Sequence, residues 1–189
     1  LETVQIDGDR NLVDFRFPVQ YVNRPNLDFR GFAGTIASGV VRPGDEIMVL
    51  PSKKRSRVKA VVTAEGELEQ AFAPQAITLT LEDEIDASRG DMFVHVNNLP
   101  HTGHRLEAML VWMDEQPLVP GQQYQIKQGT QLVNGVVSKV RYQTDINTLR
   151  QKGNDPLKLN EIGRVEINAS RPLSFDAYEQ NRATGSFVI

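Results

Sequence analysis

The sequence contains no cysteine, which excludes disulfides, thiolate metal sites and cysteine nucleophiles. Nothing in it indicates an oxidising compartment, so we expect a cytoplasmic protein. No apolar run approaches the roughly 18 to 20 residues that a membrane-spanning helix needs. The first six residues, LETVQI, also lack the charged and then apolar pattern of a signal peptide. We therefore expect a soluble protein with no membrane partner.

Neither sign of charge is in large excess. The sequence has 21 Lys and Arg residues and 24 Asp and Glu residues, which gives a net charge of -3. Such a surface has no general attraction for phosphate backbones, so nucleic acid is not an expected partner. The Gly-Lys pair of a phosphate-binding P-loop is absent from the sequence. An Asp-x-x-Gly pattern at Asp28 and Gly31 stands alone, and we interpret it as a turn.

Metal-binding and catalytic residues do not form a coherent set. His95, His101 and His104 cluster in the sequence, but no carboxylate follows at ligand spacing. The acidic stretch 82–86 could bind a divalent cation, although acidic turn residues are more often solvated. We expect no catalytic residues, no metal and no cofactor in this chain.

Alternation of apolar and other residues with a period of two dominates what is present. Phe15, Phe17, Val19 and Tyr21 alternate in this way, which predicts a strand with these four side chains on its buried face and Arg16 on the other face. The pattern returns in four further stretches: 47–49, 77–81, 106–112 and 165–169. Strands therefore run through the whole chain.

Turn-forming residues cut these strands short. Pro43-Gly44 and Pro120-Gly121 each precede a strand, one in each half of the chain, which favours two units of similar size. Only 67–72 and 145–151 could form a helical turn or two. Many short strands without helices predict an all-β fold of two consecutive small β-barrels. The polar, breaker-rich stretch 97–104 reads as a linker, so we predict domains at residues 1–98 and 99–189.

Two segments are candidate interaction surfaces. The connection 23–31 is long for a hairpin and carries Asn23, Arg24, Phe29 and Arg30, residue types that dominate binding hot spots. The alternative is an ordinary surface loop whose Phe29 packs on its own barrel.

The second candidate is a basic run with Lys53, Lys54, Arg55 and Arg57, which could contact an acidic partner. No aromatic residue interleaves this run, which argues against binding of single-stranded nucleic acid. A solvated hairpin is the alternative.

Three segments resemble the second, barrel-shaped domain of translational GTPases such as elongation factor Tu: RFPV at 16–19, RGFAGTIASG at 30–39 and VRPGDEI at 41–47. Within that superfamily, NRPNLDFRG at 23–31 and NRATGSFVI at 181–189 are similar to the GTPase subunits of bacterial sulfate adenylyltransferases. The resemblance covers essentially the whole chain, and 106–189 looks like the third, also barrel-shaped, domain. It implies that the GTP-binding domain and the last strand of the second barrel lie outside these residues.

In that family the intact subunit hydrolyses GTP and couples this to synthesis of adenosine 5′-phosphosulfate from ATP and sulfate. The resemblance implies a heterodimeric parent nucleotidyltransferase, with GTP and Mg²⁺ bound in a domain outside this chain and no activity in these barrels. The implied partners are the chain's own GTP-binding domain and the small catalytic ATP sulfurylase subunit. Two alternatives stay open: barrels that bind aminoacyl-tRNA, as in translation factors, and a free-standing enzyme on a barrel scaffold.

Overall fold

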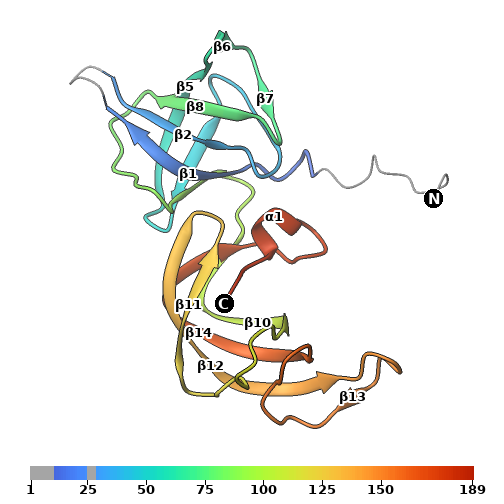
Figure 1. Cartoon of the computed structure of the whole chain (residues 1–189). Coiled ribbons are helices and arrows are strands. Elements are labelled where there is room, and N and C mark those ends of the chain that lie inside the picture. Colours follow the sequence, from blue (N-terminus) through green and yellow to red (C-terminus); the bar gives the residue numbers. More distant parts are fainter. Residues whose placement is uncertain (1–10, 25–28) are drawn as a thin grey trace, which may run out of the picture. The chain divides into compact units, whose positions relative to one another are not determined.

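The computed structural model describes residues 11–24 and 29–189, and nearly all of its regular structure is β-strand (Figure 1). The all-β fold predicted from the sequence is confirmed. The residues form two compact units. The first takes the described chain up to Thr102 together with Gln128–Gln131 and Ser174–Phe187, and the second takes Gly103–Lys127, Leu132–Leu173 and the last two residues. Because the chain passes between the units more than once, the single boundary after residue 98 stays a prediction.

The first unit is built on a ring of paired strands. Its strands are β1 (Arg16–Asn23), β2 (Gly31–Thr35), β3 (Val40–Val41), β4 (Glu46–Leu50), β5 (Lys54–Thr63), β6 (Gly66–Leu68), β7 (Ala71–Phe72), β8 (Ala76–Leu81) and β9 (Met92–His95). The main sheet has the order β4-β9-β1-β2-β8-β5-β6, and β4 also pairs with β5. That last pairing joins the strands from β4 to β5 in a closed ring, and β3 pairs separately with β7.

Aromatic rings fill the interior of this ring. Phe17 and Phe93 lie 6.0 Å apart between ring centroids, and Phe32 meets Phe93 edge-on at 5.0 Å. All three side chains are buried, and offset or edge-on contacts of this kind stabilise a core beyond the area they bury. The alternating apolar residues of the sequence therefore do form the core of the first unit.

The strand β1 departs from its predicted alternation at one point. Phe15, Phe17 and Val19 are buried as predicted, but Tyr21 is 65% exposed. The pairing of β1 with β2 shifts register between Val19 and Tyr21. A β-bulge of this kind adds one residue and reverses the facing of the strand beyond it. The prediction for Tyr21 was therefore wrong.

The second unit contains most of the residues of the five remaining strands. These are β10 (His101–Val111), β11 (Gln123–Gln128), β12 (Gln131–Thr144), β13 (Gln151–Lys152) and β14 (Ile162–Phe175), in the order β10-β14-β12-β11 with β13 paired to β12. The predicted strand at 106–112 forms most of β10. Near the end of the chain, Val188 bridges to Lys127 of β11. The core of this unit includes Trp112, which meets Tyr124 edge-on at 5.7 Å.

Helical structure is confined, in the described chain, to one short helix, α1 (Arg182–Gly185). The stretch 67–72 forms parts of β6 and β7 instead of a helical turn, and 145–151 forms a turn leading into β13. Among the described residues, no helix is long and apolar enough to cross a membrane.

Candidate functional site

Both predicted interaction segments lie on the first unit and contact one acidic stretch, residues 82–86. An Arg24 Nη2 atom lies 3.0 Å from Glu84 Oε1, and Arg30 Nη2 lies 3.3 Å from Asp86 Oδ1. Asn23 ends β1 and is exposed. The middle of the predicted loop, residues 25–28, lies outside the described residues. The two ends of the loop are thus held by carboxylates that follow β8.

The same acidic stretch also holds the basic run. Arg57 Nε lies 3.8 Å from Glu82 Oε2, and the Ser56 hydroxyl donates a 2.9 Å hydrogen bond to Asp83 Oδ2. Arg57 also donates to the carbonyl oxygen of Gly44 at 2.9 Å. Each carboxylate of this stretch is therefore engaged by a side chain of its own unit, which accounts for the acidic cluster without a bound cation. We call this stretch the acidic loop.

Three cations of the basic run have a different environment. Lys53, Lys54 and Arg55 are exposed, and none of them forms an ion pair with another described residue. Lys53 adopts a φ of 61°, the left-handed conformation, in the turn from β4 to β5. We call these three residues the basic turn. They form the part of the predicted surface whose charge is free to attract an anionic partner.

Phe29 and Arg30 are less exposed than a simple hot-spot picture requires. Phe29 is half-buried, and its ring lies over Gly31, where a Cβ atom would stand 2.9 Å from Phe29 Cε1. The Arg30 guanidinium lies 5.4 Å from the centroid of the Phe32 ring, a cation–π geometry. Its buried Nε has no hydrogen-bond acceptor among the described residues. The structure thus favours a packed base for this loop, and its role as an interface stays a prediction.

The three histidines have separate partners. His95 Nε2 lies 3.2 Å from Asp45 Oδ2, and His104 Nδ1 lies 3.0 Å from the carbonyl oxygen of Ala169. His101 packs against Phe175 with ring centroids 6.0 Å apart. Across residues 11–24 and 29–189, no group of three or more His, Asp or Glu side chains is arranged to hold a metal ion.

A buried ion pair in the first unit was missed by the sequence analysis. Arg16 is 1% exposed and Asp176 is 4% exposed. Arg16 donates from Nε and Nη2 to the two carboxylate oxygens of Asp176, each at 2.9 Å. Its other hydrogen bonds reach the carbonyl oxygens of Phe15 and Asn98, at 2.9 Å, and Asn98 Oδ1, at 3.0 Å. All five guanidinium N–H groups therefore have an acceptor.

The segment after Asp176 adds further donors to this ion pair. The Thr184 hydroxyl donates to Asp176 Oδ2 at 2.7 Å. Asn181 Nδ2 donates to the Ser38 hydroxyl oxygen at 2.7 Å, and Asn181 Oδ1 accepts from the backbone N–H of Ala183 as the N-cap of α1. Two residues of the 181–189 segment that carries the family resemblance thus have a structural role in the first unit. We call Arg16, Asp176 and these donors the buried polar cluster.

Asp14 is the second carboxylate beside this cluster. Burial raises its pKa, but hydrogen bonds from Asn11, Asn98 and Gln180, together with the charge of Arg16, outweigh burial and hold the pKa below its usual value of 3.8. Asn11 Nδ2 donates at 2.6 Å and Gln180 Nε2 at 3.0 Å, both to Asp14 Oδ2. The folded state therefore prefers the ionised form.

This preference predicts an acid-sensitive contribution to stability. A carboxylate whose folded pKa is lowered stabilises the fold above its unfolded pKa, and that stabilisation is lost as pH falls through the folded value. We expect Asp14→Asn to be less stable than the natural chain near neutral pH, because its amide would face the donors of Asn11 and Gln180, and the difference should narrow below about pH 3.8. Urea unfolding at a series of pH values measures this. The prediction would be contradicted if the difference in free energy of unfolding between the natural chain and Asp14→Asn stayed constant down to about pH 2.5.

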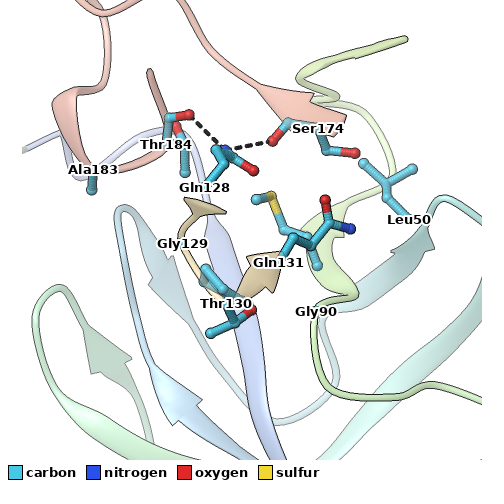
Figure 2. Close-up of a pocket in the computed structure, with 11 residues that line it drawn as sticks. Leu50, Gly90, Gln128, Gly129, Thr130, Gln131, Ser174, Ala183 and Thr184 are labelled. Carbon is cyan, nitrogen blue, oxygen red and sulfur yellow. Dashed lines mark hydrogen bonds between the residues drawn. The ribbon is translucent and has the colours of Figure 1, made fainter. Parts of the chain in front are cut away.

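A small cavity in the first unit lies beside Gln128 (Figure 2). The Gln128 side-chain amide donates to the carbonyl oxygens of Ser174, at 3.0 Å, and Thr184, at 2.8 Å. Two lining side chains, Thr130 through its hydroxyl and Gln131 through Oε1, have no hydrogen-bond partner among the described residues. The cavity volume of about 10 Å³ has room for roughly one water molecule, and ligand pockets are many times larger.

Comparisons with known proteins agree with the resemblance found in the sequence. Residues 105–189 match the family described as GTP-eEF1A C-terminal domain-like. Over 189 residues, the whole chain, it is 56% identical to sulfate adenylyltransferase subunit 1 of Alteromonas mediterranea, of which it covers 40%. It is 57% identical to the bifunctional enzyme CysN/CysC of Rhodopirellula baltica, of which it covers 29%. The chain thus spans less than half of the length of these curated relatives.

Solved structures show the same fold at low sequence identity. The structure of Sup35 complexed with GDP superimposes with a TM-score of 0.84 at 16% identity, over 94% of this chain and 44% of that one. Translation elongation factor SelB from Methanococcus maripaludis gives 0.70 at 17% identity, over 93% and 38%. These two likenesses show the architecture of the chain alone.

Proposed function

We propose that this chain, a relative of sulfate adenylyltransferase subunit 1 along its whole length, supplies the non-catalytic barrels of such a subunit. In this proposal a GTP-binding domain outside these residues binds GTP and Mg²⁺, and hydrolysis is coupled to synthesis of adenosine 5′-phosphosulfate by a separate catalytic subunit. One observation carries the proposal. The chain is 56% identical, over its whole length, to sulfate adenylyltransferase subunit 1 of Alteromonas mediterranea. The barrels would hold the GTP-binding domain and the partner in place.

The described contacts suggest how the first unit would bind a neighbour. Arg24 and Glu84 form an ion pair whose side chains are 46% and 68% exposed. Exposed pairs contribute only about 0 to 1 kcal/mol to stability, so Arg24 can exchange Glu84 for a partner carboxylate at little cost. Lys53, Lys54 and Arg55 of the basic turn form no ion pair with another described residue. Rim cations of this kind raise association rates with an acidic partner.

A titration of the intact subunit against the catalytic subunit tests this surface. We expect Arg24→Ala and Phe29→Ala each to weaken binding by about ten-fold or more, because truncating a hot-spot residue costs at least about 1 to 2 kcal/mol. Isothermal titration calorimetry measures the dissociation constants. Arg105→Ala is a control, since Arg105 is 82% exposed and belongs to the second unit, and it should leave the affinity unchanged.

Unchanged affinity for both Arg24→Ala and Phe29→Ala would remove the loop from the interface. Binding of aminoacyl-tRNA by the intact subunit, tight at low salt and collapsing as salt rises, would instead favour the translation-factor alternative.

A further inference from the structure

The turn between β11 and β12 contributes two residues with buried oxygen atoms to the small cavity beside Gln128 (Figure 2). The atoms are the hydroxyl oxygen of Thr130 and Oε1 of Gln131, and neither has a hydrogen-bond partner among the described residues. Buried polar atoms in native proteins are nearly always hydrogen-bonded, because leaving one without a partner costs its full desolvation. Two such atoms on neighbouring residues of one cavity therefore need a shared explanation.

The turn that carries these two residues is fixed to the rest of the first unit. Gln128 is buried, and its Nε2 donates to the carbonyl oxygens of Ser174, at 3.0 Å, and Thr184, at 2.8 Å. Figure 2 shows this amide between the two carbonyl groups. Gly90 packs against the other end of the turn, since a Cβ atom there would lie 3.2 Å from Gln131 Cγ. The Gln131 side chain therefore has little freedom to turn toward bulk water.

Size and charge identify what the cavity can hold. Its volume of about 10 Å³ has room for about one water molecule. The eleven described residues that line it include no charged side chain, so a bound ion would be buried without a counter-charge at high cost. A hydroxyl group can donate and accept a hydrogen bond, whereas an amide oxygen only accepts. A neutral molecule of this size that both donates and accepts is water.

We propose that one ordered water molecule binds in this cavity and joins Thr130 to Gln131. The water accepts from the Thr130 hydroxyl and donates to Gln131 Oε1, which gives it two of the roughly two to four hydrogen bonds that buried waters make. The cavity is also lined by Pro18 of β1, Leu50 of β4 and Met92 of β9. The water thus fills the space between these strands and the turn. This inference does not depend on the proposed function.

A high-resolution crystal structure of the natural chain tests the site directly. We expect an ordered water within about 3.2 Å of both Thr130 Oγ1 and Gln131 Oε1. Thr130→Ser keeps the hydroxyl group and should keep the water. A cavity without ordered density would overturn the proposal, and so would direct hydrogen bonds from both side chains to protein groups.

Thermal unfolding gives a second test, in which the two possibilities have opposite signs. With a bound water, Thr130→Val removes one of its partners and should lower the thermal midpoint by about 2–4 °C. Without a water, the same change removes an unsatisfied polar atom, and the midpoint should stay the same or rise. Thr78→Val is the matched control, because Thr78 is also half-buried but lies on β8 and does not line the cavity. Its midpoint should not fall, since valine suits a strand.

A double-mutant cycle tests whether the two residues share one water. Gln131→Met removes the acceptor while keeping a long, unbranched side chain. Because both residues contact the same water, the loss in the double variant with Thr130→Val should be smaller than the sum of the two single losses. Additive losses would overturn the shared water. An equal fall in Thr78→Val would overturn the proposal as well, since the effect would then not be specific to the cavity.

Discussion

Arg16→Ala is expected to lower the free energy of unfolding by about 3–5 kcal/mol, the cost of leaving one member of a buried ion pair alone. Asp176 is 4% exposed, so water cannot replace the two hydrogen bonds that Arg16 donates. The variant also removes the donors to the carbonyl oxygen and the side-chain oxygen of Asn98. Urea unfolding followed by far-ultraviolet circular dichroism measures the loss.

Arg105→Ala is the matched control for this prediction. Arg105 is 82% exposed and lies 3.9 Å from Glu166, so its removal should cost less than about 1 kcal/mol. A double-mutant cycle with Asp176→Ala should show strong coupling, because removing both charges leaves neither one buried alone. A loss below about 1 kcal/mol for Arg16→Ala would contradict the importance of this ion pair.

Gly39→Ala is expected to lower the free energy of unfolding by about 3 kcal/mol or more. Gly39 has a φ of 79°, and a Cβ atom there would lie 2.5 Å from the backbone nitrogen of Phe15, with Phe15 Cα closer still. A backbone neighbour cannot rotate away as a flexible side chain can. The substitution must therefore displace the chain just before β1, next to the buried polar cluster. Thermal or urea unfolding measures the effect.

Gly44→Ala isolates the part of that cost that comes from the backbone angle alone. Gly44 has a φ of 90°, but no atom lies within 4 Å of its added Cβ. Its cost should be about 1–2 kcal/mol, the usual penalty for a left-handed residue with a side chain. Equal losses for Gly39→Ala and Gly44→Ala would show that the close approach of Gly39 to Phe15 is relieved without cost.

The strands could be predicted because burial inside a sheet leaves a period of two in the sequence. The bulge at Val19 could not, since one extra residue leaves no local signature when both neighbours are compatible with a strand. Arg16 shows a second limit. Alternation correctly put it on the face opposite Phe15 and Phe17, but did not show that this face is also covered. The cover comes from Asp176, 160 positions away in the sequence.

The candidate surface shows the same division between local and distant information. Residue type alone marked Arg24, Arg30 and Arg57 as candidate contacts. Their carboxylate partners in the acidic loop lie 60 positions beyond Arg24 and 56 beyond Arg30. These pairs form because β2 pairs with both β1 and β8, the strand that the acidic loop follows. The short helix α1 was missed because four residues contain too few turns for helical periodicity to appear.

The way the chain returns to its first unit bears on how that unit is made in the cell. Synthesis runs from the amino end, so the strands of the β4-to-β5 ring emerge long before Asp176, Asn181 and Thr184. Until then the guanidinium of Arg16 lacks its carboxylate partner. The first barrel would therefore stay incompletely folded while the second unit is translated. Completion of the first barrel would therefore come late in synthesis of this chain, after residues 176–184 have been made.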